Sequence, residues 1–210
     1  MADHSARLAQ ITNGALELFT EKHRVRERVI VLSREVIRHS ANAIRAVQRT
    51  ELDQAGEILH EARVRLREAQ ALLVNHPDLN YTGYSQDAQK EYAEACCVLA
   101  FIGGGQLPLP DEIGVDVASY LNGLAEAASE LRRYILDSLR RDQDEHCEEL
   151  LGVMDGVYNL LVVMDFPDAL TNNLRRTTDQ LRGVLERTRG DLTMALRQRR
   201  LERLLAQHEP

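Results

Sequence analysis

The chain has 210 residues, of which 44% are apolar and 28% are charged, and its formal net charge is −7 at pH 7. This length suits one domain with a sizeable core, so we expect a single helical domain over residues 1–210, and the negative net charge by itself argues against a nucleic-acid partner. Aromatic residues make up only 4% and tryptophan is absent, so the core must consist mainly of Leu, Val, Ile and Ala, which favours packed helices.

Several other classes of protein are disfavoured by the sequence. The N-terminus has no basic region followed by an apolar run, and no stretch approaches the length of a bilayer span, so we expect a soluble, cytoplasmic protein. The three cysteines form neither a disulfide framework nor paired C-x-x-C motifs, and the seven histidines do not pair at helical spacing. A disulfide scaffold and a zinc or di-iron centre are therefore poor interpretations.

The basic residues are almost all arginine: of 26, only Lys22 and Lys90 are lysines. Arginine has a planar guanidinium that matches phosphate and stacks on bases. A GC-rich genome produces the same bias without any functional cause. The composition therefore allows a positive face on an acidic protein but does not establish one.

The first fifty residues predict a long helix with a separate segment before it. Residues 1–19 are expected to be an N-terminal extension or a first helix, the helix starting at about residue 5, with a weak point at Thr12-Asn13-Gly14. From about residue 20 to 49, apolar residues recur every three or four positions, which predicts a long helix packed on other helices. The opposite face carries arginines with few acids beside them: Arg24, Arg28, Arg34, Arg38, Arg45 and Arg49. Such a run is usually a solvated face.

Five further helices are predicted by apolar spacing and by their start and stop signals. Their expected ranges are 52–73, 86–102, 117–141, 143–164 and 167–206, and residues 197–210 form a basic tail. Ser85 and Asp116 are candidate N-caps, and three glycines at 103–105 end the second of these helices. No strand-like alternation is sustained, so the expected fold class is all-α.

Two acidic pairs lie at helical spacing. Glu91 and Glu94 are three residues apart, and Glu126 and Glu130 are four apart on the next long helix. If the two helices are neighbours, four carboxylates converge, and Mg²⁺ is the hard cation that commonly neutralises such a group. The alternative is that they are ordinary solvated or ion-paired helix residues.

The chain resembles the translin family, and within it the catalytic member, translin-associated factor X (TRAX). The resemblance covers about residues 20–196 and is strongest in four segments. These are Arg26-Glu27-Arg28-Val29-Ile30-Val31-Leu32-Ser33-Arg34-Glu35, Gln89-Lys90-Glu91-Tyr92-Ala93-Glu94-Ala95, Tyr120 to Leu131, and Met154-Asp155-Gly156. Because translin proper lacks the first acidic pair, this chain resembles the catalytic branch, and we expect a prokaryotic or archaeal homologue.

The resemblance implies an all-α bundle of six to seven long helices that assembles into a closed hollow oligomer, typically an octamer, around RNA. It also implies an endoribonuclease that depends on Mg²⁺, with Mn²⁺ as the alternative ion, and that cleaves single-stranded RNA. The residues implied as metal ligands and catalytic residues are Glu91, Glu94, Glu126 and Glu130. Glu126 stands where the family has Asp, so its carboxylate is carried by one more methylene.

RNA contacts transfer less completely. Arg26 matches a basic family position, and we add Arg34 and Arg38 from the arginine face as expected RNA-binding residues. The basic residues that translin carries ahead of its third helix are replaced here in the region of Thr82, Tyr84 and Gln86. Single-stranded DNA is a second possible ligand.

Two other functions remain open at this point. The first is a translin-like scaffold that binds single-stranded RNA or DNA without cleaving it. The second is a helical interaction protein without a nucleic-acid ligand, for which the acidic charge and the leucine seams suffice.

Overall fold

The computed structural model describes residues 4–80 and 83–207, and the chain is helical without a strand in these ranges. The all-α prediction is therefore confirmed. The helices are α1 (Ser5–Gln48), α2 (Leu52–Leu73), α3 (Pro77–Asn80), α4 (Gly83–Gly103), α5 (Pro110–Ile113), α6 (Val117–Arg140), α7 (Cys147–Val162), α8 (Asp168–Thr171) and α9 (Leu174–Ala206). No helix of this described part is both long enough and apolar enough to cross a membrane.

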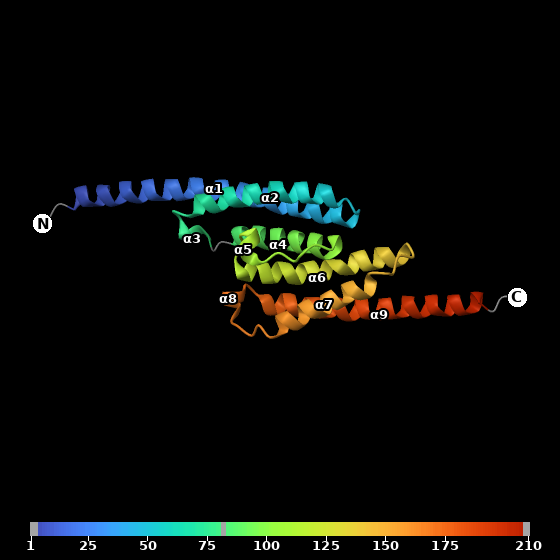
Figure 1. Cartoon of the computed structure of the whole chain (residues 1–210). Coiled ribbons are helices and arrows are strands. Elements are labelled where there is room, and N and C mark those ends of the chain that lie inside the picture. Colours follow the sequence, from blue (N-terminus) through green and yellow to red (C-terminus); the bar gives the residue numbers. More distant parts are fainter. Residues whose placement is uncertain (1–3, 81–82, 208–210) are drawn as a thin grey trace.

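The long helices form three layers (Figure 1). Helices α1 and α2 pack side by side in the first layer, α4 and α6 form the middle layer, and α7 and α9 form the third. Helix α4 contacts both helices of the first layer, and α6 contacts both helices of the third. The N-terminal half of α1 and the C-terminal half of α9 extend beyond the layers at opposite ends (Figure 1).

The core follows the apolar seams of the long helices. On α1, Val25, Val29, Leu32 and Val36 are nearly inaccessible to solvent, as the heptad-like spacing predicts. Many of the buried core residues of α4 and α6 are alanines, whose small side chains permit close helix packing. Leucines close the third layer, among them Leu181, Leu185 and Leu192 of α9, each with at most 1% of its surface exposed.

The N-terminal segment differs from the prediction. Residues 5–19 are continuous with the long helix, and α1 runs without a break from Ser5 to Gln48. The weak point at 12–14 does not end it, because one interior glycine costs only about 1 kcal/mol and the Thr12 hydroxyl donates to the Leu8 carbonyl at 2.9 Å. The N-cap assigned to Ser85 is also wrong, since α4 begins at Gly83 and Ser85 is buried within it.

The C-terminal helices also begin later than expected. Helix α7 begins at Cys147 rather than at 143: Asp142 adopts a positive φ just after α6, and residues 145–146 form a second turn before the helix starts. The expected helix from 167 is interrupted after α8, where Asn172 and Asn173 both adopt left-handed conformations, which Asn tolerates better than most residues. Buried Asn122 of α6 fixes this break, since it donates to the Thr171 carbonyl and accepts from the Thr177 hydroxyl.

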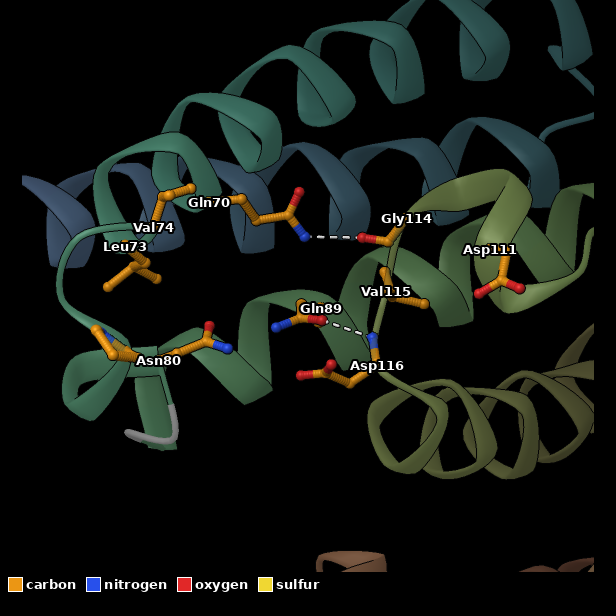
Figure 2. Close-up of a pocket in the computed structure, with 10 residues that line it drawn as sticks. Gln70, Leu73, Val74, Asn80, Gln89, Asp111, Gly114, Val115 and Asp116 are labelled. Atoms are coloured by element: carbon orange, nitrogen blue, oxygen red, sulfur yellow. Dashed lines mark hydrogen bonds between the residues drawn. The ribbon is translucent and has the colours of Figure 1, made fainter.

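The connection between α5 and α6 is held by two glutamines (Figure 2). Gln70 of α2 donates to the Gly114 carbonyl at 2.7 Å, and Gln89 of α4 accepts the Asp116 backbone N–H at 2.8 Å. Both bonds line a pocket of mixed polarity between α2, α4 and this connection. They fix the start of α6 against α4, although the Asp116 side chain makes no capping hydrogen bond.

Gly123 marks the closest approach of α4 and α6. A Cβ added at this position would lie 2.5 Å from the Lys90 carbonyl oxygen and 2.9 Å from the Glu94 backbone nitrogen. Only glycine fits such a contact, so Gly123 brings the backbone of α6 directly against the segment of α4 that carries Glu91 and Glu94.

We therefore expect Gly123→Ala to lower the free energy of unfolding by about 1–3 kcal/mol, because the two helices must separate. The matched control is Gly152→Ala on α7, where an added Cβ meets no atom within 4 Å. That control should be neutral or stabilising, by at most about 1 kcal/mol, through its higher helix propensity. Urea unfolding of both variants measures the difference, and equal stabilities would contradict the close contact.

Candidate metal centre

Three of the four predicted carboxylates converge between α4 and α6. Glu91, Glu94 and Glu126, hereafter the acidic cluster, each offer an oxygen, and these oxygens all lie within 4.8 Å of one another. All three side chains are half-buried. Octahedral Mg²⁺ binds oxygens at about 2.1 Å, which separates adjacent ligands by about 3 Å, so small side-chain rotations suffice for one ion to contact all three. The acidic cluster fits a hard divalent cation.

The ammonium of Lys90 lies in contact with the acidic cluster. Its Nζ is 2.9 Å from Glu126 Oε1, 2.8 Å from Glu126 Oε2 and 3.4 Å from Glu91 Oε1. Lys90 is the residue directly before Glu91 on α4, so its position in the sequence places its ammonium group beside the carboxylates. The Lys90 side chain is only 22% exposed, which makes this a sheltered ion pair rather than a surface one.

Glu130, the fourth predicted residue, lies one turn beyond Glu126 on α6 and is not one of the three converging side chains. Its Oε1 accepts a hydrogen bond from the side-chain amide of Gln48, at the end of α1. Gln48 is 9% exposed, and its own carbonyl oxygen is buried without a hydrogen-bond partner among the described residues. Gln48 thus positions Glu130 and leaves one acceptor free for a donor such as water.

The electrostatics of the acidic cluster disfavour full ionisation without a cation. Burial, with added repulsion from Glu91, Glu126 and Glu130, raises the pKa of Glu94 to about 8. Burial also raises the pKa of Glu91, against the opposing effect of Lys90. Neighbouring carboxylates that hold a proton near neutral pH are typical of sites that bind a metal or perform catalysis, although structural networks shift pKa values too.

More of the arginines on the exposed face of α1 form ion pairs with acidic residues than the sequence suggested. Arg24, Arg28 and Arg49 form ion pairs with Glu21, Glu68 and Glu51. Of the predicted RNA-binding residues, Arg34 and Arg38 are exposed and make no ion pair within the part of the chain that the structure describes.

The third predicted RNA-binding residue, Arg26, pairs with Glu27 and lies 5.9 Å from the centre of the Tyr84 ring. Tyr84 belongs to the region that the sequence resemblance led us to expect in place of translin's basic residues. Thr82 of the same region lies outside the described residues.

Sequence reasoning missed Lys90 and Gln48 as members of the site. Lys90 was detectable, because it directly precedes Glu91 and is one of only two lysines in the chain. Gln48 gave no local signal, since it lies 82 residues from Glu130 and only the tertiary packing brings them together.

The raised pKa of Glu94 predicts how stability depends on pH in metal-free protein. A folded-state value of about 8 against an ordinary 4.5 means that the folded protein keeps a proton that the unfolded chain releases. The free energy of unfolding is therefore highest below pH 4.5 and falls as pH rises through 8, by at most about 5 kcal/mol, since each tenfold change in proton affinity is worth about 1.4 kcal/mol. Glu94→Gln should remove most of this loss in urea unfolding at pH 5 and pH 8.5, measured in EDTA.

The control is Glu61→Gln, which changes an exposed glutamate of α2. It should keep the pH dependence of the unaltered chain. A Glu94→Gln profile that parallels the control would show that Glu94 ionises normally.

The chain is similar in sequence to one family of proteins over most of its length. The model of the translin family matches residues 24–188. An uncharacterized protein of Methanocaldococcus jannaschii is 29% identical over 182 residues, which cover 86% of this chain and 80% of that protein.

Among solved structures, the complex of AfC3PO with duplex RNA is 30% identical, with a TM-score of 0.79 over 92% of this chain and 98% of that one. A crystal structure of AfC3PO is 31% identical, with the same TM-score and coverage. The apo-NeC3PO structure, at 19% identity and a TM-score of 0.74 over 92% of this chain and all of that one, shows likeness of fold alone. Since the family model spans most of the chain and the folds agree, this chain belongs to the translin family.

Proposed function

We propose that this protein is a metal-dependent endoribonuclease that cleaves RNA within an oligomeric, TRAX-like assembly. The observation that carries the proposal is the convergence of Glu91, Glu94 and Glu126 into one group that fits a divalent cation. The likeness to AfC3PO, solved as a complex with duplex RNA, supports RNA as the substrate. The presence of both acidic pairs supports the catalytic branch of the family.

The chemistry follows from the residues that surround the acidic cluster. A bound Mg²⁺ or Mn²⁺ supplies a Lewis acid that lowers the pKa of a water and stabilises charge on the scissile phosphodiester. Glu91, Glu94 and Glu126 would hold the ion through their oxygens. Glu130 accepts a hydrogen bond from Gln48 and lies near enough to raise the pKa of Glu94, and we assign it as a further ligand or as the acceptor of a proton from the bound water. Glu126, although one methylene longer than the family's Asp, still brings an oxygen within 4.8 Å of oxygens of Glu91 and Glu94.

Substrate binding rests on the exposed arginines of the first layer. Arg34 and Arg38 are exposed and unpaired within the described ranges, so their guanidinium groups are available to phosphate. We further propose a closed homo-oligomer, an octamer as in the family pattern, with RNA enclosed. Single-stranded DNA is a second ligand of the same surface, because arginine–phosphate contacts do not distinguish the two sugars.

A non-catalytic RNA-binding scaffold is the second candidate, and one observation favours it. Lys90 already neutralises part of the acidic cluster, with both oxygens of Glu126 in contact with its ammonium. A carboxylate group balanced by its own lysine can be stable without a metal. The two candidates differ in cleavage, not in RNA binding.

Cleavage of labelled single-stranded and duplex RNA in Mg²⁺ or in EDTA tests the proposal. We expect cleavage only with the metal. Glu91→Gln should lower the cleavage rate by about 100-fold or more, because removing a metal ligand weakens metal binding more than removing a residue that hydrogen-bonds to a ligand. Glu61→Gln is the exposed control on α2 and should cleave normally. RNA binding without cleavage in either condition would contradict the endoribonuclease and support the non-catalytic RNA-binding scaffold.

RNA binding through α1 has a separate test in the charge reversals Arg34→Glu and Arg38→Glu. Each should weaken RNA binding and lower the slope of log affinity against log salt concentration by about one for each phosphate that is no longer neutralised. Arg176→Glu on α9, in the opposite layer, is the matched control for the change in net charge. Fluorescence anisotropy at several salt concentrations measures the slopes. Equal effects at all three positions would show that Arg34 and Arg38 are ordinary solvent-exposed residues that do not contact RNA.

A further inference from the structure

Lys90 has a position that the proposed reaction does not explain. Its ammonium lies 2.8 and 2.9 Å from the two oxygens of Glu126 and 3.4 Å from Glu91. The side chains of Lys90, Glu91 and Glu126 are 22%, 28% and 33% exposed, so water screens these contacts only in part. A single cation of the chain itself thus contacts two of the three carboxylates that fit a metal.

A divalent ion and this ammonium compete for the lone pairs of Glu126. Both oxygens of Glu126 lie within hydrogen-bond distance of Nζ, so a metal bound by this carboxylate either shares an oxygen with the ammonium or displaces the ammonium from it. Even after that displacement, a lysine anchored at the adjacent position of α4 keeps a positive charge near the ion. Both effects lower the affinity for a divalent cation.

We propose that Lys90 is the built-in counter-ion of the acidic cluster and competes with the divalent cation for Glu126. In the metal-free protein it holds Glu126 and Glu91 close together and offsets their repulsion. When a metal binds, the ammonium leaves Glu126. Lys90 thereby sets the metal concentration at which the site fills. This inference rests on the metal site of the proposed function and assigns the residue that regulates its occupancy.

Mn²⁺ affinity of the full-length chain tests the inference without reference to RNA cleavage. Free Mn²⁺ is measured by electron paramagnetic resonance in titrations of the unaltered protein, Lys90→Gln, Lys90→Arg and Lys22→Gln. Lys22 is the other lysine and pairs with Asp78 at 2.8 Å, so Lys22→Gln makes the same change in net charge away from the site. A double variant, Glu91→Gln with Glu94→Gln, identifies binding at the acidic cluster.

We expect Lys90→Gln to bind Mn²⁺ about tenfold more tightly than the unaltered protein. Lys22→Gln should bind as the unaltered protein does, and Lys90→Arg should stay close to it because the charge is kept. Without metal, Lys90→Gln should melt at a lower temperature, and Mn²⁺ should raise its melting temperature by more than it raises that of the unaltered protein. Far-UV circular dichroism confirms that each variant is folded.

The outcomes separate this inference from the proposed function. If the unaltered protein binds Mn²⁺ through Glu91 and Glu94 but Lys90→Gln binds it equally or less tightly, competition by Lys90 is wrong and the metal site stands. If only Lys90→Gln binds Mn²⁺, competition is supported in its strongest form. If neither binds Mn²⁺, both the inference and the proposed metal dependence are overturned.

Discussion

The close approach of α4 and α6 at Gly123 is the contact on which the candidate site depends. With no side chain at this position, the α6 backbone lies directly against Lys90 and Glu94 of α4. The next turn of α6 then carries Glu126 to the two glutamates of α4. A larger residue at Gly123 would move α6 outward and separate the carboxylates, so the packing of two helices and the chemistry of the site share one cause.

This geometry has an electrostatic cost. Three half-buried carboxylates repel one another, and the shifted pKa of Glu94 is the consequence of burial and of that repulsion. The fold offsets the cost locally with the ammonium of Lys90 and with the hydrogen bond from Gln48 to Glu130. These contacts compensate part of the negative charge of the site, and the remainder is available to a divalent cation.

Much of the fold was predictable from the sequence, because long apolar seams determine where helices lie. The predicted range 52–73 agrees with α2, and α6 begins directly after Asp116 as expected. Breaks were less predictable: the glycine at position 14 does not interrupt α1, whereas two adjacent asparagines before Leu174 do interrupt the C-terminal segment. The difference arises because an interior glycine costs little, whereas asparagine readily takes the left-handed conformation when a buried neighbour fixes it.

The site was predictable only where its signal was local. Helical spacing indicated that Glu91 and Glu94 share a face, but the contact between α4 and α6 that brings Glu126 to them is tertiary. The spacing of Glu126 and Glu130 does not say which neighbour they face, and the structure shows that Glu126 faces α4, where it pairs with Lys90. Whether such carboxylates bind a metal depends on distances that spacing cannot supply. Anomalous diffraction from crystals soaked in Mn²⁺ measures this most directly. The account predicts an ion bonded to Glu91, Glu94 and Glu126 with the Lys90 ammonium moved off Glu126; no anomalous peak there, with that ion pair intact, would contradict it.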